Sequence, residues 1–347
     1  MTTRCIMRGR SVWRTAGRGR ATMARIHFKV TALAVYLLAL AVYSTLMLIS
    51  TLESDLRHQD QDHQHDLKSY EGQVNEAALT RDHNPRFRRA VDHHWLRTVQ
   101  DFYTRLKTTE TSCTKLIQLG GSFCRGNIDN DKFLCLDDDV TLTPGNCTVY
   151  SFGIGDDSTF DDQANFYGCD VFMFDPTIDQ EPVLSTNYKR QHFYSLGLDI
   201  KKNQNHTTIV NYVDNNETKT IHGELDTYDG IRARLHHQHR TVHYLKLDIE
   251  ANEWRVLPYM MERGLLDGVR QLAIEVHTMN IIKAPQHMVL DMLRGYWTVL
   301  MGLTRMGFLR AVYRPTVVLE SLYTVPGDNT TIPTCFEVLF LRRGPVY

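Results

Sequence analysis

Residues 149–177 read VYSFGIGDDSTFDDQANFYGCDVFMFDPT. The stretch opens with β-branched and aromatic residues, which favour a strand over residues 148–152. A Gly-x-Gly pair follows, and residues 158–167 have the spacing of a helix with Ser158 as its N-cap. Residues 170–174 predict a second strand. A strand, a glycine turn, a helix and another strand in this order predict the start of a parallel α/β sheet.

The same alternation continues to the C-terminus. The expected strands are residues 148–152, 170–174, 192–196, 243–249, 270–276, 308–313 and 335–342. The expected helices are residues 91–106, 158–167, 225–235, 253–262 and 286–306. A cysteine-bearing connector before the first strand and a polar insertion after the third contain no expected strand. The pattern predicts a Rossmann-like α/β fold with a doubly wound, mostly parallel seven-stranded sheet.

Gly153 and Gly155 form the glycine turn, and Asp175 stands at the end of the next strand. Glycine lets the backbone approach a bound nucleotide closely, and an acid at this position can accept hydrogen bonds from both ribose hydroxyls. A dinucleotide fingerprint needs a third glycine, where this chain has Ser158. The acidic residues 156–157 would repel a pyrophosphate and suit a cationic ligand. These residues favour S-adenosylmethionine over NAD as the cofactor.

A more specific resemblance is carried by residues 149–177, by HFYSLGL at residues 192–198, and by YLKLDIEANEWRVLPYMMERGLLDGVRQLAIEVH at residues 244–277. The chain resembles the methyltransferase-like protein 24 group and, more distantly, the FkbM-type O-methyltransferases, over residues 91–343. The resemblance implies a class I methyltransferase that uses S-adenosylmethionine. It places Asp248 near the methionine end of the cofactor or the substrate. It implies cofactor contacts at Gly153, Gly155 and Asp175, and we also expect Asp157 and Leu198 to contact the cofactor.

Two positions depart from the pattern of these families. Many methyltransferases have an acid two positions before the first glycine, where this chain has Ser151. FkbM-type proteins tend to have Glu-Gly where this chain has Glu250 and Ala251. Neither change removes a group that cofactor binding requires.

Acidic and imidazole side chains mark the ends of the fourth and fifth expected strands. Asp248 and Glu250 alternate along the first of these ends, and Glu275 and His277 along the second, so each pair points to one face. Ligands of a doubly wound sheet bind at the carboxyl ends of its strands. We therefore expect a catalytic site of these four residues, with His277 as a base for a substrate hydroxyl. The set also suits Mg²⁺ or Mn²⁺, although we expect no resident metal. Methyl transfer mainly needs positioning of the nucleophile, which can suffice without a strong base.

The N-terminal part predicts a membrane anchor. Basic residues without an acid precede residue 30, and residues 30–49, VTALAVYLLALAVYSTLMLI, carry no charge. About 20 apolar residues span a bilayer core, and Lys and Arg stay on its cytoplasmic side. We expect a cytosolic tail (residues 1–29), a transmembrane helix (30–49), a polar stem (50–90) and a luminal methyltransferase-like domain (91–347). Such a chain is a single-pass type II membrane protein of the Golgi or the secretory pathway.

Glycosylation acceptors and cysteines agree with a luminal side. Acceptor triplets begin at Asn146, Asn205, Asn216 and Asn329. Six cysteines follow the anchor, and an even number in an oxidising compartment indicates disulfides. Four of them are closely spaced, namely Cys113, Cys124, Cys135 and Cys147. We expect at least one bridge among these four and expect Cys169 to be a small buried residue. Without a CxxC pair, a structural zinc site is not favoured.

Other classes of function remain open. A type II anchor with a polar stem is typical of luminal glycosyltransferases, and Asp137 with Asp139 offers an Asp-x-Asp pair for a metal. A methyltransferase fold can also act as a non-catalytic interaction domain, and Glu250 and Glu275 can serve only neighbouring backbone or Lys246. The net charge of −1 gives no bias toward nucleic acid. The acceptor is expected to be a luminal glycan, lipid or polypeptide, which the sequence does not select among.

In sealed microsomes, a protease added outside should leave the chain after residue 50 intact, because this part is expected in the lumen. Glycosidase should lower the mass of the protected fragment, since the acceptor triplets face the same compartment. A protease-accessible domain of unshifted mass would contradict both the orientation and the expected disulfides.

Overall fold

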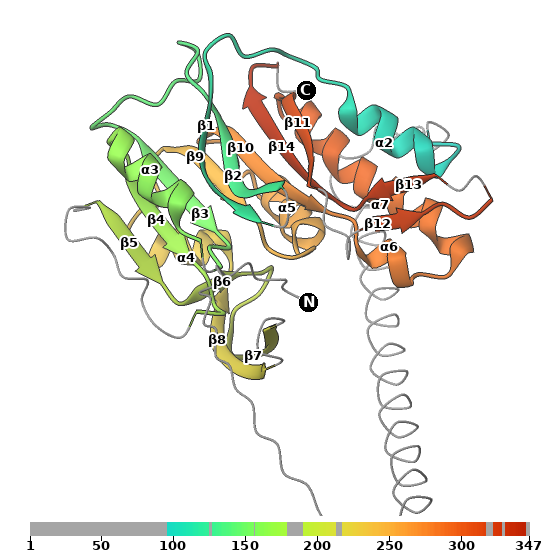
Figure 1. Cartoon of the computed structure of the whole chain (residues 1–347). Helices are drawn as coiled ribbons and strands as arrows, with labels where there is room; N and C mark the ends of the chain where they lie inside the picture. The colour runs from blue at the N-terminus through green and yellow to red at the C-terminus, as the bar shows by residue number, and fades with distance from the viewer. Residues whose placement is uncertain are drawn as a thin grey trace, which may run out of the picture. The chain divides into compact units, whose positions relative to one another are not determined.

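The structure, a computed structural model, describes residues 96–124, 127–155, 157–178, 190–212, 217–316, 322–327 and 330–344. The expected cytosolic tail, transmembrane helix and stem, residues 1–29, 30–49 and 50–90, lie outside these residues. Within the described ranges, no helix combines the length and the apolar character needed to cross a membrane. The fold is therefore that of the domain expected over residues 91–347 (Figure 1).

A seven-stranded sheet forms the centre of the domain, in the order β11-β14-β10-β9-β3-β4-β5 (Figure 1). Its strands are β3 (Thr148–Phe152), β4 (Asp170–Phe174), β5 (Gln191–Tyr194), β9 (Val242–Leu247), β10 (Val269–His277), β11 (Phe308–Thr316) and β14 (Cys335–Arg342). Only β14 runs antiparallel to its neighbours in this sheet, and the other pairs are parallel. The predicted mostly parallel, seven-stranded sheet is confirmed.

The order in which the chain adds strands reverses between β3 and β9. From β3 the chain adds β4 and β5 on one side, and later adds β9 and β10 on the other. A doubly wound sheet opens a crevice at such a switch point, beyond the carboxyl ends of its strands. The glycine turn after β3 and Asp248 after β9 therefore border the same crevice.

Helices cover one face of the sheet. They are α2 (Val99–Lys107), α4 (Tyr228–Arg234), α5 (Glu253–Glu262) and α7 (Gln286–Arg305). Aromatic side chains join them: Trp254 of α5 stacks on Tyr296 of α7 with ring centroids 4.1 Å apart, and Phe102 of α2 meets Trp297 edge to face. The bounds of α5 are those predicted. In contrast to the prediction, α2 begins only at Val99, where a capping box with Thr98 fixes its first turn.

The other face is covered by α3 (Thr159–Tyr167) and by a hairpin of β1 (Leu116–Cys124) and β2 (Asn127–Cys135) (Figure 1). A Cβ at Gly120 of β1 would stand 2.4 Å from the backbone of Phe160, so the glycine allows hairpin and helix to touch. The sequence reading treated this hairpin as a connector. Its second strand, NIDNDKFLC, buries an aspartate and a lysine, which hides the alternation typical of strands.

Smaller elements fill the polar insertion and the C-terminal region. A three-stranded sheet contains β6 (Leu196–Leu198), β8 (Glu217–Asp226) and β7 (Asn203–Tyr212), in that order. The expected helix 225–235 therefore starts only at Tyr228, because residues 225–226 end β8. A short helix α6 (Asn280–Lys283) and the strands β12 (Leu322–Thr324) and β13 (Thr331–Pro333) complete the described elements.

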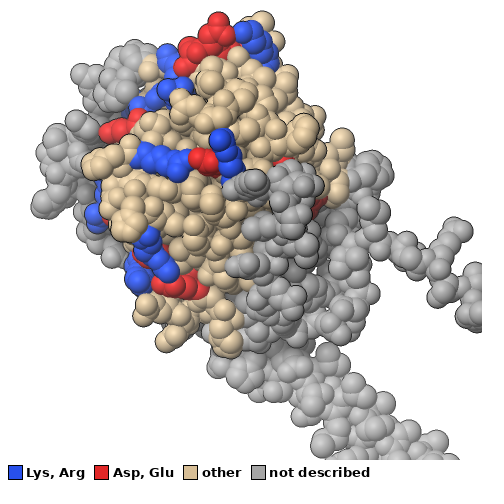
Figure 2. All heavy atoms as spheres, turned by 90° about the vertical axis from the view of Figure 1, so that its left-hand side faces the viewer, with Lys and Arg blue, Asp and Glu red and all other residues tan. Residues whose placement is uncertain are grey.

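Surface charge on one side of the domain is mixed. Figure 2 shows Lys and Arg side chains next to Asp and Glu on this face, in small groups on a largely uncharged surface. Neighbouring charges of opposite sign cancel within a Debye length of about 8–10 Å. This face therefore has no extended field of one sign.

Two disulfides join residues at or next to the ends of neighbouring strands. Cys113 bonds to Cys135 at the end of β2, which confirms a bridge among the four closely spaced cysteines. Cys147 bonds to Cys169, which corrects the expectation that Cys169 is an unpaired buried residue. The reason is the sheet register: Thr148 pairs with Asp170, so the residues directly before them stand side by side.

Mass mapping without reductant should find the Cys113–Cys135 and Cys147–Cys169 peptides cross-linked. The variant that replaces both Cys147 and Cys169 with serine should lose about 3 kcal/mol of unfolding free energy, because the unfolded chain gains the freedom of a 22-residue loop. Cys335→Ser, at a thiol outside both bridges, should leave the cross-linked peptides unchanged. Recovery of Cys169 as a free thiol would contradict this pairing.

Candidate functional site

The glycine turn after β3 is packed tightly on one side and open on the other. Gly153 has a φ of +80° and donates its N–H to the carbonyl oxygen of Phe174 (2.9 Å). A Cβ at Gly153 would stand 1.7 Å from the carbonyl oxygen of Asp248, so only glycine fits here. A Cβ at Gly155 would meet nothing within 4 Å. The turn therefore presents its backbone to open space at Gly155.

Asp175 holds this turn in shape. Its Oδ2 accepts hydrogen bonds from the backbone N–H groups of Ile154 (2.9 Å) and Gly155 (2.8 Å). Its Oδ1 accepts from the N–H and the hydroxyl of Thr177, at 2.7 and 2.6 Å. A carboxylate offers about four acceptor positions, and these contacts engage all of them. A ribose at the expected place must therefore share or replace the contacts with Thr177.

Asp157 and Leu198, the remaining expected cofactor contacts, offer different groups. Oδ1 of Asp157 accepts the N–H of Thr159 (2.9 Å) at the start of α3. Oδ2 of Asp157 is buried and has no hydrogen-bond partner in the described part of the chain. Leu198 is buried in β6, and its carbonyl oxygen accepts from the side chain of Asn252 (2.8 Å). Asp157 thus keeps an unused acceptor two residues after Gly155, whereas Leu198 offers an apolar side chain.

A buried cluster forms at the ends of three neighbouring strands, on the face that the hairpin covers. Its members are Asp248 after β9, Glu275 and His277 on β10, and Glu337 and Cys335 on β14. Glu275 pairs with Glu337, and His277 with Cys335, across the antiparallel strands. Asp248 follows Leu247, whose partner directly precedes Glu275. The structure therefore brings together three of the four expected catalytic residues.

Glu250, the fourth, has no hydrogen bond or ion pair with these residues in the described part of the chain, but it lies near enough for its charge to raise the pKa of His277. Its side chain is exposed, and its backbone has a left-handed φ of +54°. Ala251 follows with a φ of +72°, at the position where FkbM-type proteins tend to have glycine. The left-handed conformation costs a non-glycine residue about 1–2 kcal/mol. This departure from the family pattern thus places backbone strain directly after Asp248.

Lysine side chains neutralise the cluster. The fully buried ammonium of Lys132, on β2, lies 2.5 Å from Glu337 Oε1, 3.4 Å from Asp248 Oδ2 and 3.5 Å from Glu275 Oε2. The ammonium of Lys246, on β9, lies 3.7 Å from Asp248 Oδ2 and donates to the carbonyl oxygen of the first glycine of the turn. The lysines thus connect the carboxylates to one another and to the glycine turn.

The imidazole of His277 is oriented from α5. Its Nδ1 lies 3.1 Å from Oε1 of Glu253, a fully buried residue at the start of α5. Trp254 donates its indole N–H to the carbonyl oxygen of His277 (2.6 Å). The Nε2 of His277 faces the cluster, 3.9 Å from both Asp248 Oδ1 and Glu275 Oε1. Helix α5 therefore fixes both the ring and the backbone of this residue.

The pKa values of the two central carboxyl groups, Asp248 and Glu275, are shifted in opposite directions. Burial opposes ionisation of Asp248, but Lys132 and Lys246 outweigh it and hold the pKa of this carboxyl well below its usual value. Burial raises the pKa of Glu275 well above its usual value, and the neighbouring Asp248 carboxylate raises it further. These surroundings favour the ionised form of Asp248 and the protonated form of Glu275.

The pKa of His277 is raised well above its ordinary value. Burial alone would lower it, but the carboxylate of Glu253 reverses this effect through its charge and its hydrogen bond. At neutral pH the ring is therefore charged, and a charged imidazole cannot accept a proton. In this arrangement Asp248 can accept a hydrogen bond from a substrate hydroxyl, although its lowered pKa makes it a weak base.

An acid does stand near Ser151, although it comes from a helix. Ser151 pairs with Lys246 in the sheet. The buried carboxyl of Asp161, on α3, faces the ammonium of Lys246 and the hydroxyl of Ser151. Burial raises the pKa of Asp161 to about 6, against the opposing effects of both neighbours. The carboxyl that the family motif carries on its strand is thus supplied across space by α3.

Asp137 and Asp139 do not form the metal pair that a glycosyltransferase needs. The guanidinium of Arg343, just after β14, lies 2.8 Å from Asp137 Oδ2 and 2.5 Å from Asp139 Oδ2. Asp137 also accepts the backbone N–H groups of Thr114 and Lys115, and these contacts with Arg343 lower its pKa to about 2. Asp137 and Asp139 thus link the segment between β2 and β3 to the end of β14.

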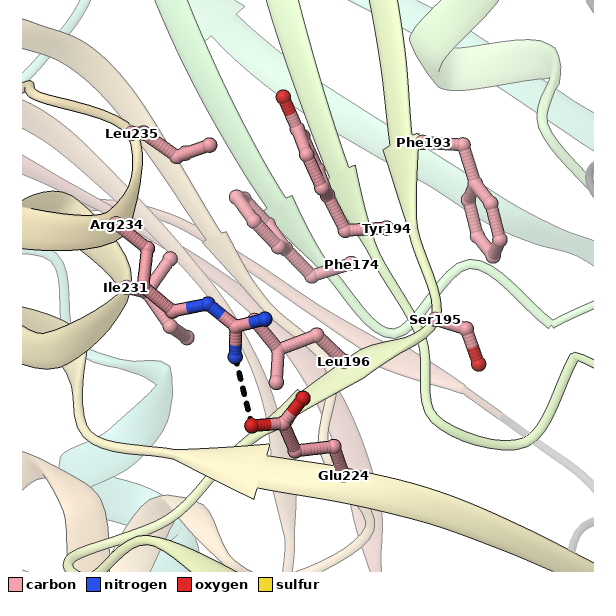
Figure 3. Close-up of a pocket in the computed structure, with 9 residues that line it drawn as sticks. All are labelled: Phe174, Phe193, Tyr194, Ser195, Leu196, Glu224, Ile231, Arg234 and Leu235. Atoms are coloured by element: carbon pink, nitrogen blue, oxygen red, sulfur yellow. Dashed lines mark hydrogen bonds and ion pairs between the residues drawn. The ribbon is translucent and has the colours of Figure 1, made fainter. Parts of the chain in front are cut away.

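A cavity of about 430 Å³ opens elsewhere, on the side of the sheet that α4 covers (Figure 3). The rings of Phe174 and Tyr194, stacked with centroids 5.4 Å apart, line it together with Ile231. The ion pair of Glu224 with Arg234 (2.8 Å) borders it. None of the expected site residues lines this cavity. The expected site residues therefore lie away from this cavity.

Sequence reasoning missed Lys132, Glu253 and Glu337. Glu337 is a charge within the apolar strand CFEVLFLR, and such a charge signals a buried partner. Glu253 opens a predicted helix, where an acid is ordinary. Lys132 lies in the unrecognised hairpin, so its sequence context gave no signal.

Comparisons with known proteins agree with this geometry. The chain matches a family model described as a methyltransferase domain over residues 60–303. It is similar to "Probable methyltransferase-like protein 24" of Homo sapiens, 28% identical over 149 residues, which cover 42% of this chain and 37% of the relative. The Rattus norvegicus protein of that name is 25% identical over 181 residues, 51% of this chain and 46% of the relative. The chain thus spans less than half the length of these curated relatives. No solved structure matches it.

Lys132→Met should destabilise the domain strongly, because three carboxylates lose their shared counter-ion. Removing one partner from a buried ion pair costs about 3–5 kcal/mol, which denaturant unfolding would measure. Lys115→Met is the matched control, since Lys115 pairs with Asp138 at the surface and its loss should leave the unfolding midpoint unchanged. Equal midpoints for the two variants would contradict the role of Lys132.

Proposed function

Because the chain belongs to the methyltransferase-domain family, we propose that it transfers a methyl group from S-adenosylmethionine to a hydroxyl of a luminal or secreted acceptor. One observation supports this most. The open glycine turn after β3 stands beside the ionised carboxylate of Asp248, at the switch point of the sheet. The turn suits a nucleoside, and the carboxylate suits an acceptor hydroxyl.

The cofactor would be held by Gly153, Gly155, Asp157 and Asp175. The open backbone at Gly155 leaves room for the adenosyl group. The unpartnered Oδ2 of Asp157 suits a positively charged ligand, because a buried acceptor gains from such a partner. Asp175 supplies a carboxylate to the ribose hydroxyls when Thr177 gives up a contact. When bound, S-adenosylmethionine supplies a methyl group on a positively charged sulfur.

Asp248 would accept a hydrogen bond from the acceptor hydroxyl and so orient it. Both lysines contact its Oδ2, so Oδ1 is left for the acceptor. The side chain is 13% exposed, which allows access from the crevice. The protonated Glu275 donates a hydrogen bond to Asp248 and steadies the ionised form. Fixing the hydroxyl in line with the methyl group supplies a large part of the rate enhancement in such a transfer.

The compartment and the acceptor are part of the same proposal. The anchor expected at residues 30–49 would place this domain in the Golgi or secretory lumen as a type II membrane protein. The exposed Asn146 and Asn205 suit glycosylation there, and the disulfides suit an oxidising lumen. A glycan, a lipid or a secreted polypeptide can carry the hydroxyl.

Calorimetry with S-adenosylmethionine tests the cofactor site. Asp175→Ala should weaken binding roughly tenfold to a hundredfold, because charge-assisted hydrogen bonds worth about 1.5–3 kcal/mol are lost. Asp248→Asn should keep cofactor binding but lose methyl transfer from labelled cofactor to a secretory-pathway extract. Asp138→Asn, at the surface, is the control for both measurements. Thermal unfolding of each variant checks that the fold is intact.

Unchanged binding in a folded Asp175 variant would remove the ribose role. If the unaltered chain binds no S-adenosylmethionine, the methyltransferase proposal fails, and a non-catalytic interaction domain becomes the alternative.

A further inference from the structure

The spacing of three donor atoms in the cluster fits a metal ion better than it fits hydrogen bonds. Asp248 Oδ1 and Glu275 Oε1 each lie 3.9 Å from His277 Nε2, beyond hydrogen-bond distance. Two ligands bound at about 2.1 Å and a tetrahedral angle stand about 3.4 Å apart, and wider angles separate them further. Both carboxylate oxygens therefore stand from the imidazole nitrogen at a separation that two ligands of one small cation have.

The opposite side of each of these groups is already held. Asp248 Oδ2 faces Lys132 (3.4 Å) and Lys246 (3.7 Å), and Glu275 Oε2 faces Lys132 (3.5 Å). His277 Nδ1 lies 3.1 Å from Glu253. A carboxylate behind a histidine and hydrogen-bonded carboxylates are the usual outer contacts of metal ligands. Each ligand is thus oriented from behind, with its free atom directed inward.

Cys335 adds a fourth ligand of a different kind. It pairs with His277 across β10 and β14, and its thiol is in neither of the described disulfides. One donor atom each of Glu275, His277 and Cys335 lies within 4.8 Å of the others. A thiolate with an imidazole and carboxylates is a ligand set typical of Zn²⁺, whereas Mg²⁺ prefers oxygen ligands alone.

The net formal charge of the cluster also favours a bound metal ion. The cluster holds four carboxylates, namely Asp248, Glu253, Glu275 and Glu337, against the ammonium groups of Lys132 and Lys246. A metal ion that displaced the protons of Glu275 and His277 would leave two negative charges beyond those that the lysines balance, and such charges are costly in a buried place. A divalent cation balances them. The side chains of Asp248 and Glu275 are 13% and 10% exposed, so an ion can enter from the crevice.

We propose that Asp248, Glu275 and His277 bind a divalent zinc-type ion, with Cys335 as the fourth ligand. This reverses the expectation from the sequence that the site has no resident metal. The proposal deepens the proposed function and rests on it for one consequence: the ion would bind the acceptor hydroxyl and lower its pKa. His277 and Asp248 Oδ1 then act as ligands, and the ion rather than Asp248 Oδ1 would hold the acceptor hydroxyl.

Cobalt titration of the full chain, after removal of metal with a chelator, tests the site. Co²⁺ should bind stoichiometrically. The bound ion should show d–d absorption bands in the visible range and, in addition, a thiolate-to-cobalt charge-transfer band. Cys335→Ser should remove the charge-transfer band and keep the visible bands. His277→Ala should abolish stoichiometric binding, and Glu253→Gln should weaken it by about 10–100-fold, as loss of an outer contact does. Zn²⁺ should displace the cobalt.

His192→Ala is the matched control, because this histidine stacks on Phe172 in the sheet and belongs to no part of the cluster. It should bind Co²⁺ as the unaltered chain does. An unaltered chain without stoichiometric Co²⁺ or Zn²⁺, or His277→Ala with unchanged binding, would overturn the proposal. Calorimetry with S-adenosylmethionine on the same samples separates the two ideas. Cofactor binding without metal refutes only the metal site, and metal binding without cofactor refutes only the proposed function.

Discussion

The buried ammonium of Lys132 is the interaction on which the reaction edge of this domain depends. Carboxylates from three neighbouring strands converge on it, within 3.5 Å. A buried carboxylate without a counter-charge costs several kcal/mol, so these strand ends can pack only when a cation stands over them. The β1–β2 hairpin delivers that cation. The hairpin therefore contributes directly to the stability of these strand ends, because it carries Lys132. The Cys113–Cys135 disulfide holds the end of this hairpin in place.

The same charges couple the glycine turn, the proposed cofactor side of the crevice, to Asp248 on the proposed acceptor side. Lys246 contacts both Asp248 and the carbonyl oxygen of Gly153, and the backbone of Gly153 leaves no room for a side chain against Asp248. Asp175 then fixes the rest of the turn through Ile154 and Gly155. A shift of the glycine turn would thus move Asp248. Placing both reactants on one rigid unit is what in-line methyl transfer requires.

In each central side chain, one polar atom contacts a neighbouring charged residue and the other faces the centre of the cluster. Asp248 and Glu275 turn one oxygen to the lysines and the other toward His277, and His277 turns one nitrogen to Glu253 and the other toward the carboxylates. A buried ion network that used every atom for stability could bind nothing more. This division leaves inward-facing atoms for an acceptor or a metal ion.

The sequence by itself determined the central sheet, the bounds of α5 and the place of the glycine turn. These are local properties, because β-branched and aromatic runs of four to nine residues between turn residues favour strands. It also placed Asp248, Glu275 and His277 at strand ends, because alternation along a strand is local. Only the tertiary structure decided that Cys169 pairs with Cys147, that Asp161 stands in for an acid at Ser151, and that Lys132 lies under three carboxylates. Each of these depends on a partner distant in sequence, whose position is fixed by strand register and hairpin packing rather than by the residues on either side.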